Sequence, residues 1–186
     1  MRFTATTIPG AFMVDVDASV DDRGLFARTW CAREFAQQGI EGLPVQNSLS
    51  LSLKRGTLRG LHFQLPPSRE GKLVRCVRGA IFDVLIDLRC ESPGFLRSIN
   101  VELSAHNRRA LFVPPGVAHG FQTLADDTEV HYQMTDEYRP DLSAGVRWDD
   151  PAFGIEWPIM PPAVMSGRDL AYPDFDPAGF TAFRGY

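Results

Sequence analysis

Glycine and proline interrupt this chain so often that long helices are not expected. Its 186 residues include 16 Gly and 14 Pro, and turn signals such as Ser92-Pro93-Gly94 and Pro114-Pro115-Gly116 separate short segments in which polar and apolar residues alternate. Many short strands joined by frequent turns are typical of a β-sandwich or β-barrel. The length favours a single domain over residues 1–186.

The clearest strand pattern lies at Ile81–Arg89. Apolar residues occupy the even positions, and Asp83, Asp87 and Arg89 fall on the opposite face. This alternation predicts a strand that is buried on one face only. Similar patterns predict further strands at Leu49–Leu53, Leu73–Val77, Val101–Leu103, Leu111–Val113, Phe121–Leu124 and Thr128–Met134.

Helical spacing is scarce outside two short segments. A helix is expected at Ala32–Gln38, closed by Gly39, and a helical turn near Ser166–Leu170. From Tyr138 onward the chain is rich in Pro, Trp and Asp. We expect this part to form an irregular tail that wraps over the barrel.

Charge, hydropathy and cysteine use exclude several classes of partner. The formal net charge is −4, and the basic residues are scattered, which argues against nucleic acid. No run of 18 apolar residues could span a membrane, and the start MRFTATTIPG lacks a signal-peptide core. Cys31, Cys76 and Cys90 form no C-x-x-C pair, which suits reduced thiols. We therefore expect a soluble, cytoplasmic protein.

Two of the four histidines, His62 in GTLRGLHFQ and His119 in VPPGVAHGF, lie at predicted strands. Small barrels enclose cavities lined by inward side chains, so the two are expected to share one. A cupin-type barrel holds a divalent metal with a His-x-His pair, a Glu and a later His. Here Gln64 breaks the pair, although Glu70 follows, and a Gln amide is a poor ligand for a transition metal. We therefore expect no metal, and an imidazole that is free to act as a general base.

A base that removes a proton from carbon needs an electrophile for the enolate, and an acid on the opposite face if a centre is to be inverted. Lys72 in EGKLVRC and Tyr132 in EVHYQM are the candidates. Taken alone, they fit a solvated lysine at a strand end and a core tyrosine better. Arg23 and Arg59 could clamp a phosphate by bidentate contact, or equally form surface ion pairs.

Together these motifs resemble one family, the dTDP-4-dehydrorhamnose 3,5-epimerases, which are sugar-nucleotide epimerases of the cupin superfamily. The resemblance covers nearly the whole chain and runs through GTLRGLHFQ, EGKLVRCVRGAIFDVLIDLR, ESPGF, VELSAHNRRALFVPPGVAHGFQTLADDTEVHYQM, RWDDPAFGIEWP and MSGRD. It implies a mainly β cupin-type jelly-roll barrel with a few short helices and no metal or cofactor. It also implies epimerisation at C3 and C5 of a nucleotide-linked 4-keto-6-deoxyhexose.

The resemblance assigns a role to each matching residue. His62 matches the base, Asp169 its orienting carboxylate, Tyr132 the acid and Lys72 the residue that steadies the enolate. The substrate-binding positions are matched by Arg23, Phe26, Gln46, Arg59, His119 and Tyr138, with the two arginines near the diphosphate. The chain departs from many family members at the binding positions Arg28, Ser48 and Ser143.

In the predicted strand Leu58–Gln64, the positions of Arg59 and His62 conflict with a site that both residues share. Strict alternation places Arg59 and His62 on opposite faces, although one ligand needs both. We expect a β-bulge at Gly60 to bring them to the same side.

The N-terminal segment bears on the assembly of the protein. Apolar residues at Ile8, Ala11, Phe12 and Val14 precede the barrel. An unpaired strand there would leave an exposed edge, so we expect a homodimer in which this segment pairs with the partner's sheet.

The alternatives to a 3,5-epimerase are an epimerase acting at C3 or C5 alone, a 3,4-ketoisomerase, and a non-catalytic or metal-dependent cupin.

Overall fold

The structure is a computed structural model that describes residues 1–185. Its strands are β1 (Arg2–Ala5), β2 (Phe12–Asp15), β3 (Ala18–Asp21), β4 (Gly24–Ala27), β5 (Gln46–Ser52), β6 (Leu58–Gln64), β7 (Lys72–Arg78), β8 (Ala80–Asp87), β9 (Ser98–Ser104), β10 (Ala110–Val113), β11 (Val117–Thr123), β12 (Thr128–Met134) and β13 (Ser143–Gly145). The helices are α1 (Ala32–Ala36), the 3-10 turn η1 (Pro140–Leu142) and α2 (Gly167–Leu170). None of these helices is long and apolar enough to cross a membrane.

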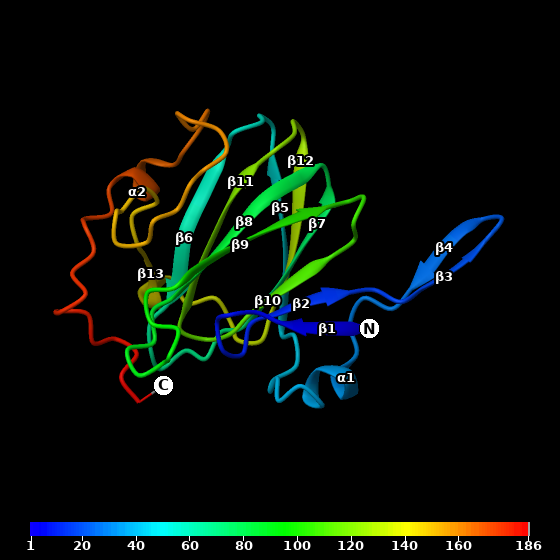
Figure 1. Cartoon of the computed structure of the whole chain (residues 1–186), viewed down its shortest axis with the longest axis horizontal. Coiled ribbons are helices and arrows are strands. Elements are labelled where there is room, and N and C mark those ends of the chain that lie inside the picture. The colour runs from blue at the N-terminus through cyan, green and yellow to red at the C-terminus, as the bar shows by residue number, and fades with distance from the viewer. Residues whose placement is uncertain (186) are drawn as a thin grey trace.

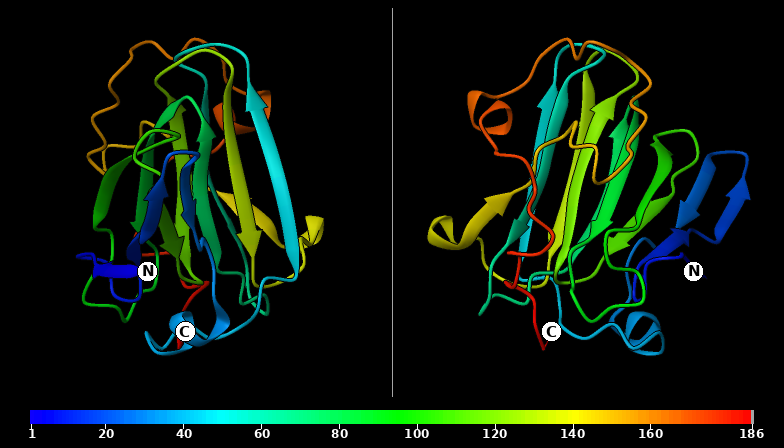
Figure 2. Two further views of the ribbon diagram at one scale, coloured as in Figure 1. Left: turned by 90° about the vertical axis from the view of Figure 1, so that its right-hand side faces the viewer. Right: turned by 60° about the vertical axis from the view of Figure 1, so that its left-hand side comes forward.

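Two antiparallel sheets face each other, and a separate hairpin extends from them (Figures 1 and 2). One sheet has the strand order β1-β2-β10-β7-β12-β5 and the other β13-β6-β11-β8-β9. The hairpin β3-β4 projects away from both sheets. Each strand predicted from alternation is present, and the predicted mainly β jelly roll with a few short helices is confirmed. Both predicted helical segments are also found, although α1 ends at Ala36, before Gln38.

Apolar side chains fill three layers. Val74 and Leu85 belong to the cluster between the two sheets. Ile86 and the fully buried Phe183 belong to a second cluster, in which the tail covers the outer face of the five-stranded sheet. Phe35 of α1 belongs to a third, on the outer face of the six-stranded sheet. The predicted irregular tail over the barrel is therefore found. It shields the outer face of the five-stranded sheet from water.

Strand β8 is buried on both faces, and the prediction of a half-buried strand is wrong. The tail covers the apolar face, while Asp83 and Asp87 point to the inside and are fully buried. Each of these carboxylates has a basic partner, because Asp83 lies 2.7 Å from the buried His119 and Asp87 lies 2.8 Å from Arg89, whose side chain is 15% exposed. Paired charges of this kind can occupy an interior that excludes unpaired ones.

The N-terminal segment pairs within its own chain. Strand β2 pairs with β10, and β1 pairs with β2 at the edge of the six-stranded sheet. Ile8, Ala11 and Val14 are fully buried in the same subunit. The expectation of an unpaired strand at Phe12–Val14 is therefore wrong, since β1 and β10 flank β2 on its two sides, while pairing of this segment with a partner's sheet, through the free edge of β1, stays a prediction.

Candidate active site

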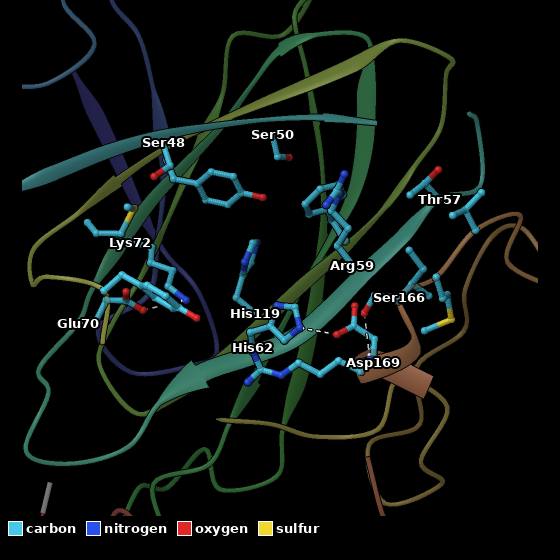
Figure 3. A pocket seen from close by; sticks show the side chains of 18 residues that line it. Ser48, Ser50, Thr57, Arg59, His62, Glu70, Lys72, His119, Ser166 and Asp169 are labelled. Carbon is cyan, nitrogen blue, oxygen red and sulfur yellow. Dashed lines mark hydrogen bonds and ion pairs between the residues drawn. The ribbon is translucent and has the colours of Figure 1, made fainter. Parts of the chain in front are cut away.

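A cavity of about 570 Å³ opens between the two sheets beside α2 (Figure 3). The residues that line it include seven of the predicted site residues, namely His62, Lys72, Tyr132, Asp169, Arg59, His119 and Tyr138. They come from four strands, from α2 and from the loop after β12. The fold therefore collects in one cavity side chains that lie far apart in the sequence.

His62 on β6 and Asp169 on α2 form a close pair. Nε2 of His62 lies 2.6 Å from Oδ1 of Asp169. The Ser166 hydroxyl accepts the Asp169 N–H at 3.0 Å, which caps α2 and sets the position of the carboxylate. Oδ2 of Asp169 accepts the backbone N–H of Gly60 at 3.3 Å.

The ionised Asp169 determines which nitrogen of the His62 ring carries the proton. Burial acts to raise the pKa of Asp169, but the hydrogen bond and charge of His62, together with the hydrogen bonds of Gly60 and Ser166, outweigh it, and the pKa lies below its ordinary value. An ionised carboxylate only accepts hydrogen bonds, so Nε2 of His62 carries a proton. Nδ1 is then the nitrogen that is free to take a proton from a ligand.

Gly60 brings Arg59 and His62 to the same cavity, as predicted. The pairing of β6 with β11 shifts register at this point, because His119 lies opposite His62 while Phe121 lies opposite Arg59. Gly60 has a φ of +124°, and a Cβ there would lie 2.6 Å from Cα of Gly120. Only glycine combines this backbone conformation with so close an approach of the two strands.

A second His–Asp pair lies deeper in the fold, and sequence reasoning missed its acid. Nε2 of His119 is 2.7 Å from Oδ1 of Asp83, and both side chains are buried. Burial raises the pKa of Asp83, while the charge and hydrogen bond of His119 act to lower it. The carboxylate was expected on a solvent-exposed face, so no signal in the sequence linked it to the cavity.

Tyr132 and Lys72 differ in how they are held. Burial raises the pKa of the Tyr132 phenol above its ordinary value, so the hydroxyl remains protonated at neutral pH. The Tyr132 ring packs edge-on against His119, with the ring centres 6.2 Å apart. Nζ of Lys72 lies 2.9 Å from Oε1 of Glu70. Both predicted partners of an enolate therefore lie inside the cavity.

Two of the positions expected for metal ligands in a cupin, Gln64 and Glu70, bond to each other, while His62 and His119 bond to Asp169 and Asp83. Gln64 donates a hydrogen bond from Nε2 to Oε2 of Glu70 at 3.0 Å. Among residues 1–185, no group of three or more His, Cys, Asp or Glu side chains could hold a metal ion.

The sequence profile described as dTDP-4-dehydrorhamnose 3,5-epimerase matches residues 5–177. The chain belongs to this family. It is 46% identical to the dTDP-4-dehydrorhamnose 3,5-epimerase of Sinorhizobium fredii, in an alignment that covers 93% of this chain and 89% of that protein. The predicted family membership is thus confirmed, and with it the assignment as an isomerase.

Two solved epimerase structures have the same fold. The dTDP-4-dehydrorhamnose 3,5-epimerase of Bacillus anthracis, crystallised with TDP and PPi bound, superposes with a TM-score of 0.90 at 37% identity, covering 94% of this chain and 99% of that one. A 3'-monoepimerase of Streptomyces bikiniensis in complex with dTDP-quinovose superposes with a TM-score of 0.83 at 31% identity, covering 91% and 85%.

Two residues that match substrate-binding positions of the family lie outside this cavity. Arg23 and Phe26 belong to the hairpin β3-β4, which Figure 1 shows extending away from the sheets. Arg23 pairs with Asp21 at 2.6 Å, and Phe26 is 80% exposed. The structure does not bring them to this cavity.

Of the remaining binding positions, Gln46 and Ser48 lie at or beside the cavity. Oε1 of Gln46 accepts the backbone N–H of Tyr138 at 2.7 Å, so Gln46 adjoins the cavity through Tyr138. Of the three positions that depart from many epimerases of the family, Ser48 lines the cavity. Arg28 pairs with Glu34 at 2.9 Å, and the Ser143 hydroxyl accepts a hydrogen bond from Arg168 at 2.9 Å.

Proposed function

We propose that this chain converts dTDP-4-dehydro-6-deoxy-D-glucose to dTDP-4-dehydro-L-rhamnose by inverting C3 and C5. It would act as a single catalytic domain over residues 1–186, without a cofactor. The observation that carries the proposal is the His62–Asp169 pair, which shares one cavity with Tyr132 and Lys72 in a member of this epimerase family.

The chemistry needs a base, an acid and an electrophile. The ketone at C4 acidifies the hydrogens on C3 and C5, so either centre can be inverted without redox chemistry. In the first step Nδ1 of His62 takes the proton, the electrons of the C–H bond form a C=C bond, and the carbonyl electrons move to the C4 oxygen. Asp169 stabilises the imidazolium, and the Lys72 ammonium offsets the charge of the enolate.

In the second step the electrons flow back. The carbonyl re-forms, and carbon takes the proton of the Tyr132 hydroxyl on the opposite face. This leaves a phenolate and an imidazolium, and transfer of one proton through solvent resets both. No atom is gained or lost overall. The raised pKa of Tyr132 keeps the phenol protonated at neutral pH, so it has a proton to donate, and it also makes the phenol a weaker acid.

The nucleotide diphosphate is assigned to the basic side of the cavity. Arg59 and His119 line it, and Arg59 is held by the Ser52 hydroxyl at 3.0 Å and the Leu51 carbonyl at 2.9 Å. A guanidinium that is fixed in this way can present its remaining N–H groups to a phosphate. Tyr138 at the rim offers an aromatic face to the nucleoside.

A homodimer would supply the missing binding residues. The strand β5 ends the six-stranded sheet, and Leu49, Leu51 and Leu53, on this strand and directly after it, are 60%, 46% and 67% exposed. The hairpin residue Phe26 is also exposed. Burial of these apolar surfaces by a second copy would place Arg23 and Phe26 of one subunit at the cavity of the other. Light scattering that shows only the 20.7 kDa monomer at micromolar concentration would refute the dimer.

Epimerisation at one centre is the second candidate, because the 3'-monoepimerase of Streptomyces bikiniensis has the same fold. We assign either reaction to the cytoplasm, where the three free cysteines would remain reduced.

Proton NMR of dTDP-4-dehydro-6-deoxy-D-glucose with the protein in D₂O tests both. Deuterium at C3 and C5 supports the 3,5-epimerase, and deuterium at one carbon supports the single-centre enzyme. No exchange at either carbon refutes both.

A further inference from the structure

The ammonium of Lys72 is held by a carboxylate for which the reaction has so far provided no role. Figure 3 shows Glu70 beside Lys72 at one end of the cavity, and Nζ lies 2.9 Å from Oε1. The Glu70 side chain is 4% exposed and that of Lys72 is 16% exposed. The two charges therefore meet largely out of water.

Glu70 is itself fixed by Gln64 at the end of β6. The amide of Gln64 donates from Nε2 to Oε2 of Glu70 at 3.0 Å. Its orientation is determined, because Oε1 accepts the backbone N–H of Arg139 at 2.7 Å, and a backbone N–H can only donate. Nε2 must then face the carboxylate. Gln64, Glu70 and Lys72 thus form a connected set, in which Gln64 holds Glu70 and Glu70 holds the Lys72 ammonium.

Stability alone does not explain this set. A buried ion pair often stabilises a fold less than apolar residues of the same size, because both ions lose their water. A free lysine, however, has several rotatable bonds and no fixed direction. Stabilisation of an enolate requires a donor that is already in position when the charge develops. An ammonium has three N–H groups, so contact with Glu70 leaves two for the cavity.

We propose that Glu70, anchored by Gln64, is a positioning residue that directs the Lys72 ammonium at the C4 oxygen of the substrate. This inference rests on the proposed function, since it assumes that Lys72 stabilises the enolate. It also gives a role to Gln64, the residue that interrupts the metal-binding pattern of a cupin. Glu70 contacts the Lys72 ammonium directly, and Gln64 acts on it through Glu70.

Substitutions at Glu70 separate charge from shape. Glu70→Gln keeps the size of the side chain but loses its charge. Its amide nitrogen can only donate, so it cannot accept a hydrogen bond from whichever of Gln64 and Lys72 it faces. We expect deuterium exchange at saturating substrate to fall about 10- to 100-fold, with KM changed less than about threefold. Glu70→Asp keeps the charge and should retain more exchange than Glu70→Gln. A purely space-filling role would reverse this order, because Gln matches Glu in volume.

Glu129→Gln is the matched control. Glu129 on β12 pairs with Arg78 at 3.7 Å and does not line the cavity. Loss of this charge should leave both exchange and KM unchanged. Circular dichroism and the urea midpoint of each variant establish that it is folded.

A double-mutant cycle with Lys72→Met provides the decisive measurement. If Glu70 acts through Lys72, Glu70→Gln should change exchange less than about twofold in the Lys72→Met background. The same fold-loss in both backgrounds would overturn the inference while leaving the proposed function intact. A wild-type protein that exchanges no deuterium at C3 or C5 would instead refute the proposed function, and this inference with it.

Discussion

Replacement of Gly60 by alanine tests the close contact between β6 and β11. An ideal Cβ at this position lies 2.6 Å from Cα of Gly120 and 2.9 Å from the carbonyl oxygen of His119. Both are backbone atoms, so the strands themselves must move apart. A φ of +124° adds strain of about 1–3 kcal/mol, and overpacking adds about 1–3 kcal/mol more. We expect Gly60→Ala to lower the free energy of unfolding by about 2–6 kcal/mol.

Urea unfolding followed by tryptophan fluorescence measures this loss. With a slope of about 2 kcal/mol per molar urea, the midpoint should fall by roughly 1–3 M. Gly24→Ala is the matched control, because Gly24 has a φ of +122° but a Cβ at this position would meet no atom within 4 Å. It should show the conformational cost alone. Equal losses for the two variants would refute the steric reasoning, and unchanged deuterium exchange in Gly60→Ala would refute the role of the bulge in placing His62.

Three further outcomes are expected. His62→Ala should lower both deuterium exchange and inversion by about 10²–10⁴-fold, whereas Tyr132→Phe should retain exchange and lose inversion. NMR in D₂O measures both quantities. Equal loss of exchange and inversion in Tyr132→Phe would assign Tyr132 to binding. Activity should survive dialysis against EDTA, because Gln64 and Glu70 bond each other; loss that one divalent ion restores would contradict this. The pKa of Asp169 is lower in the native protein than its ordinary 3.8, so its contribution to stability is present above that pH and lost as the pH falls through the native value. The difference in unfolding free energy between wild type and Asp169→Asn should therefore shrink in acid. Urea titrations from neutral to acidic pH measure this difference, and a constant difference would contradict the prediction.

Features that depend on neighbouring residues could be predicted from the sequence. The strands β7 and β12 follow from their alternation, and α2, which Ser166 caps, lies at the helical turn expected near Ser166–Leu170. The bulge at Gly60 could be inferred because a local pattern conflicted with a shared ligand. The hairpin β3-β4 was not predicted, since all but one of its residues are exposed and it has no buried face to create a pattern.

Only the tertiary structure decided which distant groups meet. His62 and Asp169 are 107 positions apart, and His119 and Asp83 are 36 apart. The alternation in β8 correctly separates its two faces, but the partner of Asp83 on the polar face is His119 of β11, 36 positions away, whereas Asp87 meets Arg89 only two positions along the chain. A local pattern reports which side chains share a face. Whether a charge on that face meets water or a buried partner depends on segments that the chain brings together only when it folds.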